Sequence, residues 1–161
     1  MNAVRPRPFE ARHNLLNIVL VEDDDGDAKA VVRALTKSHI ANPIHRLRDG
    51  IEALAFLRGE GESKPPEHYV LLLDINMPRM NGHEFLKELR ADPRLHRAVV
   101  FMLSTSEDET DVFHAYDQNV AGYIIKGRAG ADFLELIDTV EHFWRIVVLP
   151  DMSREAPLSE G

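Results

Sequence analysis

The sequence has 161 residues, which fits one domain of ordinary size, and 44% of them are hydrophobic, enough for a buried core. Its formal net charge is −8 with no basic cluster, which argues against nucleic-acid binding, and the absence of cysteine excludes disulfides and thiolate metal sites. We recognise neither a secretory signal nor an apolar run of membrane-spanning length, so we expect a cytoplasmic protein with no membrane partner.

The first predicted elements are a strand and a helix. Residues 18–21 form a short apolar run that turns abruptly acidic at Glu22, which predicts a buried strand with a polar carboxyl end. Apolar residues at helical spacing predict a helix over 27–38. Its N-cap is expected at Asp25 or Asp27, because aspartate is a preferred capping residue.

The middle of the chain repeats this order twice. A second strand is predicted at 42–47 and is followed by a helix at 49–59. A third, at 69–74, is followed by a helix at 81–93 that stops near its final proline. Both strands are short, and the third again ends in an acidic residue.

The last elements complete an alternating pattern. A fourth strand at 98–103 precedes a helix that we expect to open with a capping box, in which Ser106 caps and Glu109 reaches back. A fifth strand at 122–126 precedes a long helix at 130–149. Short apolar strands alternating with amphipathic helices predict an α/β domain, with a parallel sheet covered by helices on both faces.

The ends of the chain are polar and carry no regular apolar pattern. We expect an N-terminal extension over 1–14, one domain over 15–149 and a C-terminal tail over 150–161.

Polar side chains gather where the predicted strands end, and ligands of open parallel sheets bind at this edge. Carboxylates brought close together need a compensating cation, and Mg²⁺ prefers oxygen ligands. With an ammonium and a hydroxyl group added, the set could stabilise phosphoryl oxygens around a nucleophilic aspartate, giving an aspartyl phosphate. The residues at the ends of strands one, three, four and five are Glu22, Asp23 and Asp24, then Asp74 and Asn76, then Ser104 and Thr105, and finally Lys126.

Each of these residues also has an ordinary structural explanation. A single strand-end aspartate is usually a cap or turn residue, a lone lysine such as Lys126 usually reaches solvent, and a Ser–Thr pair is usually a cap. The joint pattern favours a site, because each group stands at the same end of a different strand.

These residues resemble the receiver domain of two-component response regulators over about 15–149. The matching segments are "VEDD" at 21–24, "LLLDINMPRMNG" at 71–82, "FMLSTS" at 101–106 and "GYIIK" at 122–126. The resemblance implies a doubly wound, flavodoxin-like fold with five parallel strands in the order 2-1-3-4-5.

The resemblance also implies a phosphorylation site. Asp74 would accept a phosphoryl group from a sensor histidine kinase. Mg²⁺ would be held by Asp74, by Asp23 directly, by Glu22 through water and by the backbone carbonyl of Asn76. No enzymatic activity of the protein's own is implied.

Three further residues would respond to the phosphoryl group in a member of this family. Ser104 would move to hydrogen-bond it, and Lys126 would pair with it. Tyr123 would be the aromatic switch that turns inward as Ser104 moves. Gly127 departs from the family, which usually has proline there with a cis bond, so we expect a trans bond between Lys126 and Gly127.

Two features are similar to stand-alone receivers that partner bacterial phytochromes: a long loop before the third strand and the ending "VEHFWRIVVLP". A bacteriophytochrome kinase is therefore the suggested partner. The last helix has an apolar arc wider than one core needs, with Phe143, Trp144 and Val147 prominent. We expect a homodimer through the fourth helix, fifth strand and fifth helix.

Two other functions remain open. A phosphatase of the haloacid dehalogenase type also uses a strand-end aspartate and Mg²⁺, but it needs a general acid where this chain has Asn76. A flavin carrier needs a phosphate-binding loop after the first strand, where "EDDDGD" would repel phosphate. The scattered His83, His96 and His114 are interpreted as surface residues.

Overall fold

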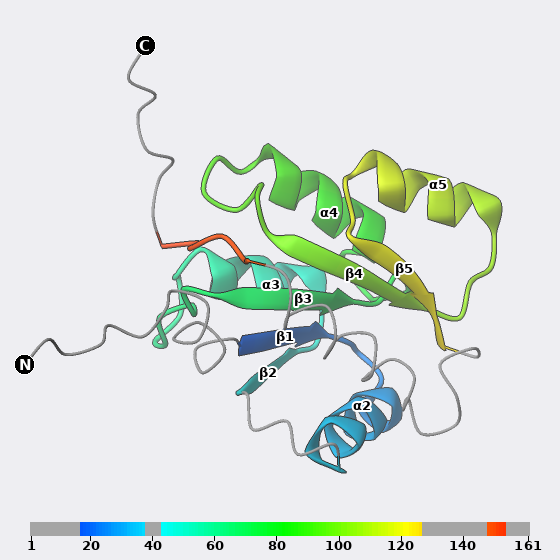
Figure 1. Cartoon of the computed structure of the whole chain (residues 1–161), viewed down its shortest axis with the longest axis horizontal. Helices are drawn as coiled ribbons and strands as arrows, with labels where there is room; N and C mark the ends of the chain where they lie inside the picture. Colours follow the sequence, from blue (N-terminus) through cyan, green and yellow to red (C-terminus); the bar gives the residue numbers. More distant parts are fainter. Residues whose placement is uncertain (1–16, 38–42, 127–147, 154–161) are drawn as a thin grey trace, which may run out of the picture.

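The computed structural model describes residues 17–37, 43–126 and 148–153, and these form a parallel sheet with helices on both faces (Figure 1). The strand order is β2-β1-β3-β4-β5, which confirms the predicted doubly wound topology. The strands are β1 (Asn17–Val21), β2 (Ile44–Leu47), β3 (Tyr69–Leu73), β4 (Val99–Ser104) and β5 (Gly122–Ile125).

The central strands are buried along almost their whole length, which explains why their sequences are continuous apolar runs. Every residue of β3 is buried. The register pairs Val21 with Leu73 and Leu73 with Met102, so the carboxyl ends of β1 and β3 are level and β4 runs two residues further, to Ser104. The residue that follows each strand therefore emerges at the same edge of the sheet.

Four helices are described: α2 (Asp25–Lys37), α3 (Gly50–Leu57), α4 (Gly82–Ala91) and α5 (Glu109–Asp117). Figure 1 shows α2 on one face of the sheet and α3, α4 and α5 on the other. Each face has its own cluster of buried apolar residues, and strand residues alternate between the two clusters. The sheet is thus covered from both sides by these helices.

The helix caps differ from the sequence expectations in two places. Helix α2 is capped by Asp24, whose carboxylate accepts a hydrogen bond of 2.7 Å from the backbone N–H of Asp27; neither Asp25 nor Asp27 is the cap. Helix α5 begins at Glu109 and is capped by Asp108, so the expected capping box from Ser106 is wrong; the Ser106 hydroxyl oxygen instead accepts from the backbone N–H of Asp108 at 3.3 Å, and its proton is donated to Asp111 at 2.6 Å. Each carboxylate satisfies a backbone N–H that the first turn leaves unpaired.

The end of the last predicted helix is described only from Val148. Most of the helix predicted at 130–149, including Phe143, Trp144 and Val147, lies outside the described residues, as does the bond between Lys126 and Gly127. Val148 and Leu149 are not helical.

Residues 148–153 pack at the amino end of the sheet. Leu149 is buried in the cluster on the α2 side, and Met152 packs against the cluster on the other face. The backbone N–H of Met152 donates to the carbonyl oxygen of Glu67 at 2.7 Å. The segment therefore contacts both cores near the start of β3.

Among the residues that the structure describes, none of the helices is both long and apolar enough to cross a membrane.

Candidate functional site at the carboxyl edge of the sheet

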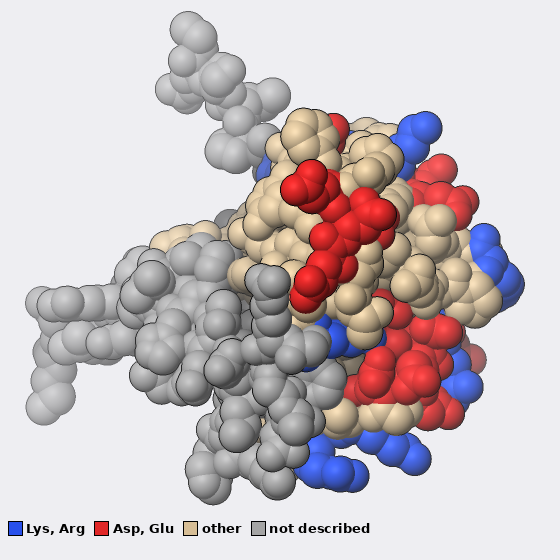
Figure 2. Space-filling model, turned by 90° about the vertical axis from the view of Figure 1, so that its right-hand side faces the viewer, with Lys and Arg blue, Asp and Glu red and all other residues tan. Residues whose placement is uncertain are grey.

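Three carboxylates meet at the carboxyl edge of the sheet. Glu22 and Asp23 follow β1, and Asp74 follows β3. One carboxylate oxygen from each lies within 4.8 Å of the others. Glu22 is only 1% exposed and Asp74 only 7%, whereas Asp23 is exposed. Figure 2, which looks at this end of the sheet, shows acidic side chains gathered over the described surface.

Burial governs the ionisation of this cluster. It raises the pKa of Glu22 from 4.5 to about 7, although the ammonium of Lys126 partly offsets the shift. It also raises the pKa of Asp74, again against the effect of Lys126. Both shifts show that the carboxylates lack full compensation for their charge in the protein alone.

The residues present suit a hard divalent cation. Their donor atoms are carboxylate oxygens, which Mg²⁺ and Mn²⁺ prefer. A cation would also supply the positive charge that the raised pKa values of Glu22 and Asp74 call for. Asn76, whose carbonyl was expected to contribute, lies in the exposed loop after Asp74.

Lys126 follows β5 and reaches this cluster with a buried stem. Its Nζ atom lies 2.8 Å from Glu22 Oε2, 2.7 Å from Asp27 Oδ2 and 3.7 Å from Asp74 Oδ1. Burial works against the charged form, but the hydrogen bonds to Asp27 and Glu22 outweigh it and raise the pKa of Lys126. The lysine is therefore cationic and faces three carboxylates at once.

Ser104 and Tyr123 lie on neighbouring strands and are linked through one loop. Ser104 is fully buried, and its hydroxyl oxygen accepts a hydrogen bond of 3.1 Å from the backbone N–H of Ser106. The hydroxyl of Tyr123 donates to the carbonyl oxygen of Ser106 at 2.9 Å. The residue two positions after Ser104 thus connects both predicted switch residues.

The same loop is tied to helix α4. The Ser106 hydroxyl donates to Asp111, and the other oxygen of Asp111 lies 2.9 Å from His83 Nε2. These contacts lower the pKa of Asp111, the bond from Ser106 contributing most. His83 is partly buried, so its interpretation as a plain surface residue is wrong, whereas His96 and His114 are exposed. The packing of α4 against α5 partly buries the imidazole ring of His83.

The loop after Asp74 folds tightly against the start of α4. The backbone N–H of Gly82 donates to the carbonyl oxygen of Ile75 at 2.8 Å. A Cβ atom at Gly82 would lie 2.5 Å from the carbonyl oxygen of Asp74 and 2.9 Å from Ile75 Cα, closer than real contacts allow. Only glycine fits here, and this close approach fixes the backbone of Asp74.

A buried acid supports the same loop from α3. Asp49 caps α3 by accepting a hydrogen bond of 2.9 Å from the N–H of Glu52. Its other oxygen accepts a hydrogen bond of 3.1 Å from Arg79 Nε. Burial works against ionisation of Asp49, but these two contacts prevail and lower its pKa. Arg79 adopts a φ of 64°, so the pair holds an unfavourable backbone conformation in place.

Arg46 on the edge strand β2 supports the acidic turn after β1. Its guanidinium donates to the carbonyl oxygen of Glu22 at 3.0 and 3.1 Å and to that of Asp23 at 3.2 Å. It also binds the Asp25 carboxylate at 2.6 Å. One side chain thus contacts three of the four consecutive acidic residues at 22–25, all but Asp24.

The structure therefore brings together Glu22, Asp23, Asp74 and Lys126, and places Ser104 at the end of the next strand. Sequence reasoning missed Asp27 and Arg46 as parts of this environment. The only signal for Asp27 was its place in an acidic first turn, which was taken for capping. Arg46 gave no signal, because arginine on an edge strand is ordinary.

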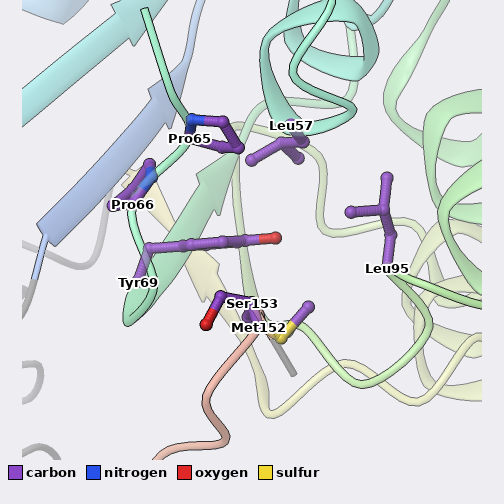
Figure 3. Close-up of a pocket in the computed structure, with 7 residues that line it drawn as sticks. All are labelled: Leu57, Pro65, Pro66, Tyr69, Leu95, Met152 and Ser153. Carbon is purple, nitrogen blue, oxygen red and sulfur yellow. The ribbon is translucent and has the colours of Figure 1, made fainter. Parts of the chain in front are cut away.

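A small cavity lies at the opposite end of the sheet. Residues from the α3–β3 loop, β3, the α4–β4 loop and the C-terminal segment line it (Figure 3). The Tyr69 hydroxyl points into it and has no hydrogen-bond partner among the described residues. Its volume is about 50 Å³, room for a few waters rather than a substrate. The cavity does not reach the carboxylates.

Comparison with known proteins identifies the family. A sequence profile of the response regulator receiver domain matches residues 18–140. The chain belongs to the response regulator receiver family. Response regulator Rcp1 of Synechocystis sp. (strain PCC 6803) is 38% identical over 135 residues, which cover 83% of this chain and 92% of Rcp1.

Two solved structures of response regulators superpose on this receiver domain. The phosphorylated cyanobacterial phytochrome response regulator RcpA is 39% identical, with a TM-score of 0.72, covering 83% of this chain and 97% of RcpA. The Mn²⁺-bound form of Rcp1 is 38% identical, with a TM-score of 0.73, covering 83% of this chain and 98% of Rcp1. The predicted resemblance to phytochrome-associated response regulators is therefore confirmed.

Proposed function

We propose that this receiver domain accepts a phosphoryl group on Asp74 from a sensor histidine kinase, in a Mg²⁺-dependent reaction. The observation that carries the proposal is the meeting of Glu22, Asp23 and Asp74 within 4.8 Å beside the ammonium of Lys126. A carboxylate nucleophile, oxygen ligands for a cation and a fixed positive charge are the parts that phosphoryl transfer requires.

In this proposal an oxygen of Asp74 attacks the phosphorus of a phosphohistidine. A P–O bond forms, the P–N bond breaks, and the imidazole leaves with its electron pair. Mg²⁺, held by Glu22, Asp23, Asp74 and the carbonyl of Asn76, would neutralise charge on the phosphoryl oxygens.

The chain's own residues then respond to the new anion. Lys126, 3.7 Å from Asp74 Oδ1, would pair with the phosphoryl group. The Ser104 hydroxyl would donate to it, and because Ser104 and Tyr123 are both bonded to Ser106, a shift of Ser104 would release or reset the tyrosine. The signal would then pass to protein partners from this face.

The proposal is tested by phosphorylation with acetyl phosphate and Mg²⁺, followed by mass spectrometry of the intact protein. We expect an added phosphoryl group on the wild type and none on Asp74→Asn. The matched control is Asp49→Asn, because Asp49 is the other buried aspartate of the described residues; it should keep the label. A labelled Asp74→Asn variant would contradict the assignment.

The same experiment separates this function from that of a small aspartyl-phosphate phosphatase. The position two residues after Asp74 holds Asn76, which cannot act as a general acid. We therefore expect one phosphoryl group per chain and slow loss. Rapid multiple turnover of acetyl phosphate would favour the phosphatase.

We propose a bacteriophytochrome-type kinase as the partner, a proposal supported by the similarity to RcpA, a cyanobacterial phytochrome response regulator, and we propose that the two proteins meet in the cytoplasm. Phosphotransfer from purified candidate kinases to the wild type, with Asp74→Asn as control, tests this. Faster transfer from kinases of another sensor class would contradict it.

We also propose a homodimer through α5, β5 and the last predicted helix, with Phe143, Trp144 and Val147 in the interface. Its support is the apolar surface of α5, where Phe113 is 69% exposed and Tyr116 50%. Sedimentation of the wild type and of Trp144→Ala tests it, and a wild type that is monomeric at tens of micromolar would contradict it.

A further inference from the structure

The ammonium of Lys126 is bound by two carboxylates that are not the proposed phosphoacceptor. Its Nζ lies 2.7 Å from Asp27 Oδ2 and 2.8 Å from Glu22 Oε2, both within hydrogen-bond distance. Asp74 Oδ1, at 3.7 Å, is outside that distance. In this state the lysine is therefore held by its neighbours rather than by Asp74.

Asp27 stands apart from the three-carboxylate cluster. It belongs to the first turn of α2, and its backbone N–H is fixed by the Asp24 cap at 2.7 Å. Its side chain is 42% exposed, whereas that of Lys126 is 8% exposed. Asp27 thus holds the ammonium from the solvent side.

We propose that Asp27 is a positioning residue that holds Lys126 in the resting state and competes with the phosphoryl group for it. This inference rests on the proposed function of Asp74. An ammonium group has three donors, and a doubly charged phosphoryl group beside Asp74 is a stronger acceptor than a single carboxylate. Glu22 and Asp27 engage two of the three donors, and Nζ lies 3.7 Å from Asp74 Oδ1, outside hydrogen-bond distance. The ammonium therefore moves toward the phosphoryl group and away from Asp27 as the new bond forms, so Asp27 opposes the activated state.

The test measures how tightly beryllofluoride, a phosphoryl mimic, binds in saturating Mg²⁺, using ¹⁹F NMR. Asp27→Asn keeps the size of the side chain and removes its charge. Because the ion pair is partly exposed, we expect binding to tighten by roughly two- to fivefold. Asp27→Glu restores the charge and should return the affinity close to the wild-type value.

The matched control is Asp25→Asn, in the same helical turn. It removes the same charge, but its carboxylate binds Arg46 at 2.6 Å and not Lys126. A general electrostatic effect would tighten binding equally in Asp25→Asn and Asp27→Asn. The proposal requires the larger gain at Asp27, and thermal melts confirm that each variant is folded.

The outcomes separate the two proposals. If the wild type binds no beryllofluoride, the proposed function of Asp74 fails. If the wild type binds it, but Asp27→Asn binds no tighter than Asp25→Asn, only the role of Asp27 is overturned. Weaker binding by Asp27→Asn would also overturn it, because Asp27 would then orient Lys126 productively.

Discussion

Arg46 on the edge strand β2 donates two hydrogen bonds, of 3.0 and 3.1 Å, to the backbone carbonyl oxygen of Glu22. The bonds cross from one strand end to the next and fix the turn that carries Glu22 and Asp23. The orientation of two carboxylates at the acidic edge therefore depends on a side chain that belongs to neither β1 nor β3.

This relationship predicts that Arg46→Lys weakens metal binding although it preserves the charge. Lysine cannot reproduce the fork that spans the carbonyl oxygens of Glu22 and Asp23. We expect roughly tenfold weaker Mn²⁺ binding, the lower range for a residue that orients metal ligands. Paramagnetic resonance of free Mn²⁺ measures this. The control is Arg48→Lys, because Arg48 is exposed and makes only a long contact of 4.0 Å with Asp25. Equal losses of Mn²⁺ affinity in both variants would contradict the prediction.

The close approach of Gly82 to Asp74 predicts a large effect of one methyl group. In Gly82→Ala the new Cβ would meet backbone atoms that cannot move aside. We expect the free energy of unfolding to fall by about 1–3 kcal/mol, as for other forced contacts. Urea denaturation measures it. Gly61→Ala is the control, since a Cβ there meets no atom within 4 Å, and it should change stability by less than about 0.5 kcal/mol.

The buried carboxylates predict an unusual pH dependence in the absence of divalent cations. Folding raises the pKa of Glu22 to about 7 and also raises that of Asp74. Their contribution to stability is thus full below their unfolded values, 4.5 and 3.8, and is lost as pH rises through the folded values. In EDTA, Glu22 and Asp74 should therefore contribute less to the free energy of unfolding at pH 8 than at pH 5.

Replacing one of these acids should therefore stabilise the metal-free protein. We expect Asp74→Asn to raise the free energy of unfolding by about 1 kcal/mol at pH 8, after allowance for solvent screening. Urea denaturation in EDTA checks this. Added Mg²⁺ should stabilise the wild type more than the variant. A destabilised Asp74→Asn in EDTA would show that the carboxylates are better compensated than their burial implies.

Asp49 should make stability depend on pH in the opposite direction to Glu22 and Asp74. Its pKa is lowered on folding, so its contribution is present above its unfolded value of 3.8 and is lost as pH falls through the folded value. Asp49→Asn keeps the cap but loses the charge that binds Arg79, which should cost about 1 kcal/mol at pH 7. The difference between variant and wild type in urea denaturation should shrink as pH falls below 3.8 and disappear once the pH is below the lowered pKa of Asp49 in the folded protein. A constant difference would assign the effect to packing.

The sequence predicts the sheet and the main carboxylates because both depend on local patterns. Apolar runs such as 69–73 are buried on both faces, and an acidic residue after such a run must emerge at the carboxyl edge. The contacts of Asp27 and Arg46 could not be predicted in this way. Asp27 meets Lys126 across 99 positions, and a capping role explained it equally well from sequence alone.

The helix caps show a second limit of prediction from sequence. Ser106 and Asp108 are both good capping residues, and local preference cannot choose between them. In the structure the helix begins at Glu109, so Asp108 caps α5, while the Ser106 hydroxyl accepts from the N–H of Asp108 and donates to Asp111, five residues further on. His83 was misjudged for the same reason, because its partner is Asp111 on another helix.

The docking of residues 148–153 has a practical consequence for probing the molecule. Met152 is anchored to Glu67 at the amino end of β3, whereas Asp74 lies at the carboxyl end of that strand. A dye, a surface tether or a pulling handle attached just after Ser153 would thus transmit strain to the amino end of the sheet, away from Asp74. Attachment there leaves the acidic edge free for measurement, whereas removal of Leu149 and Met152 would open both cores.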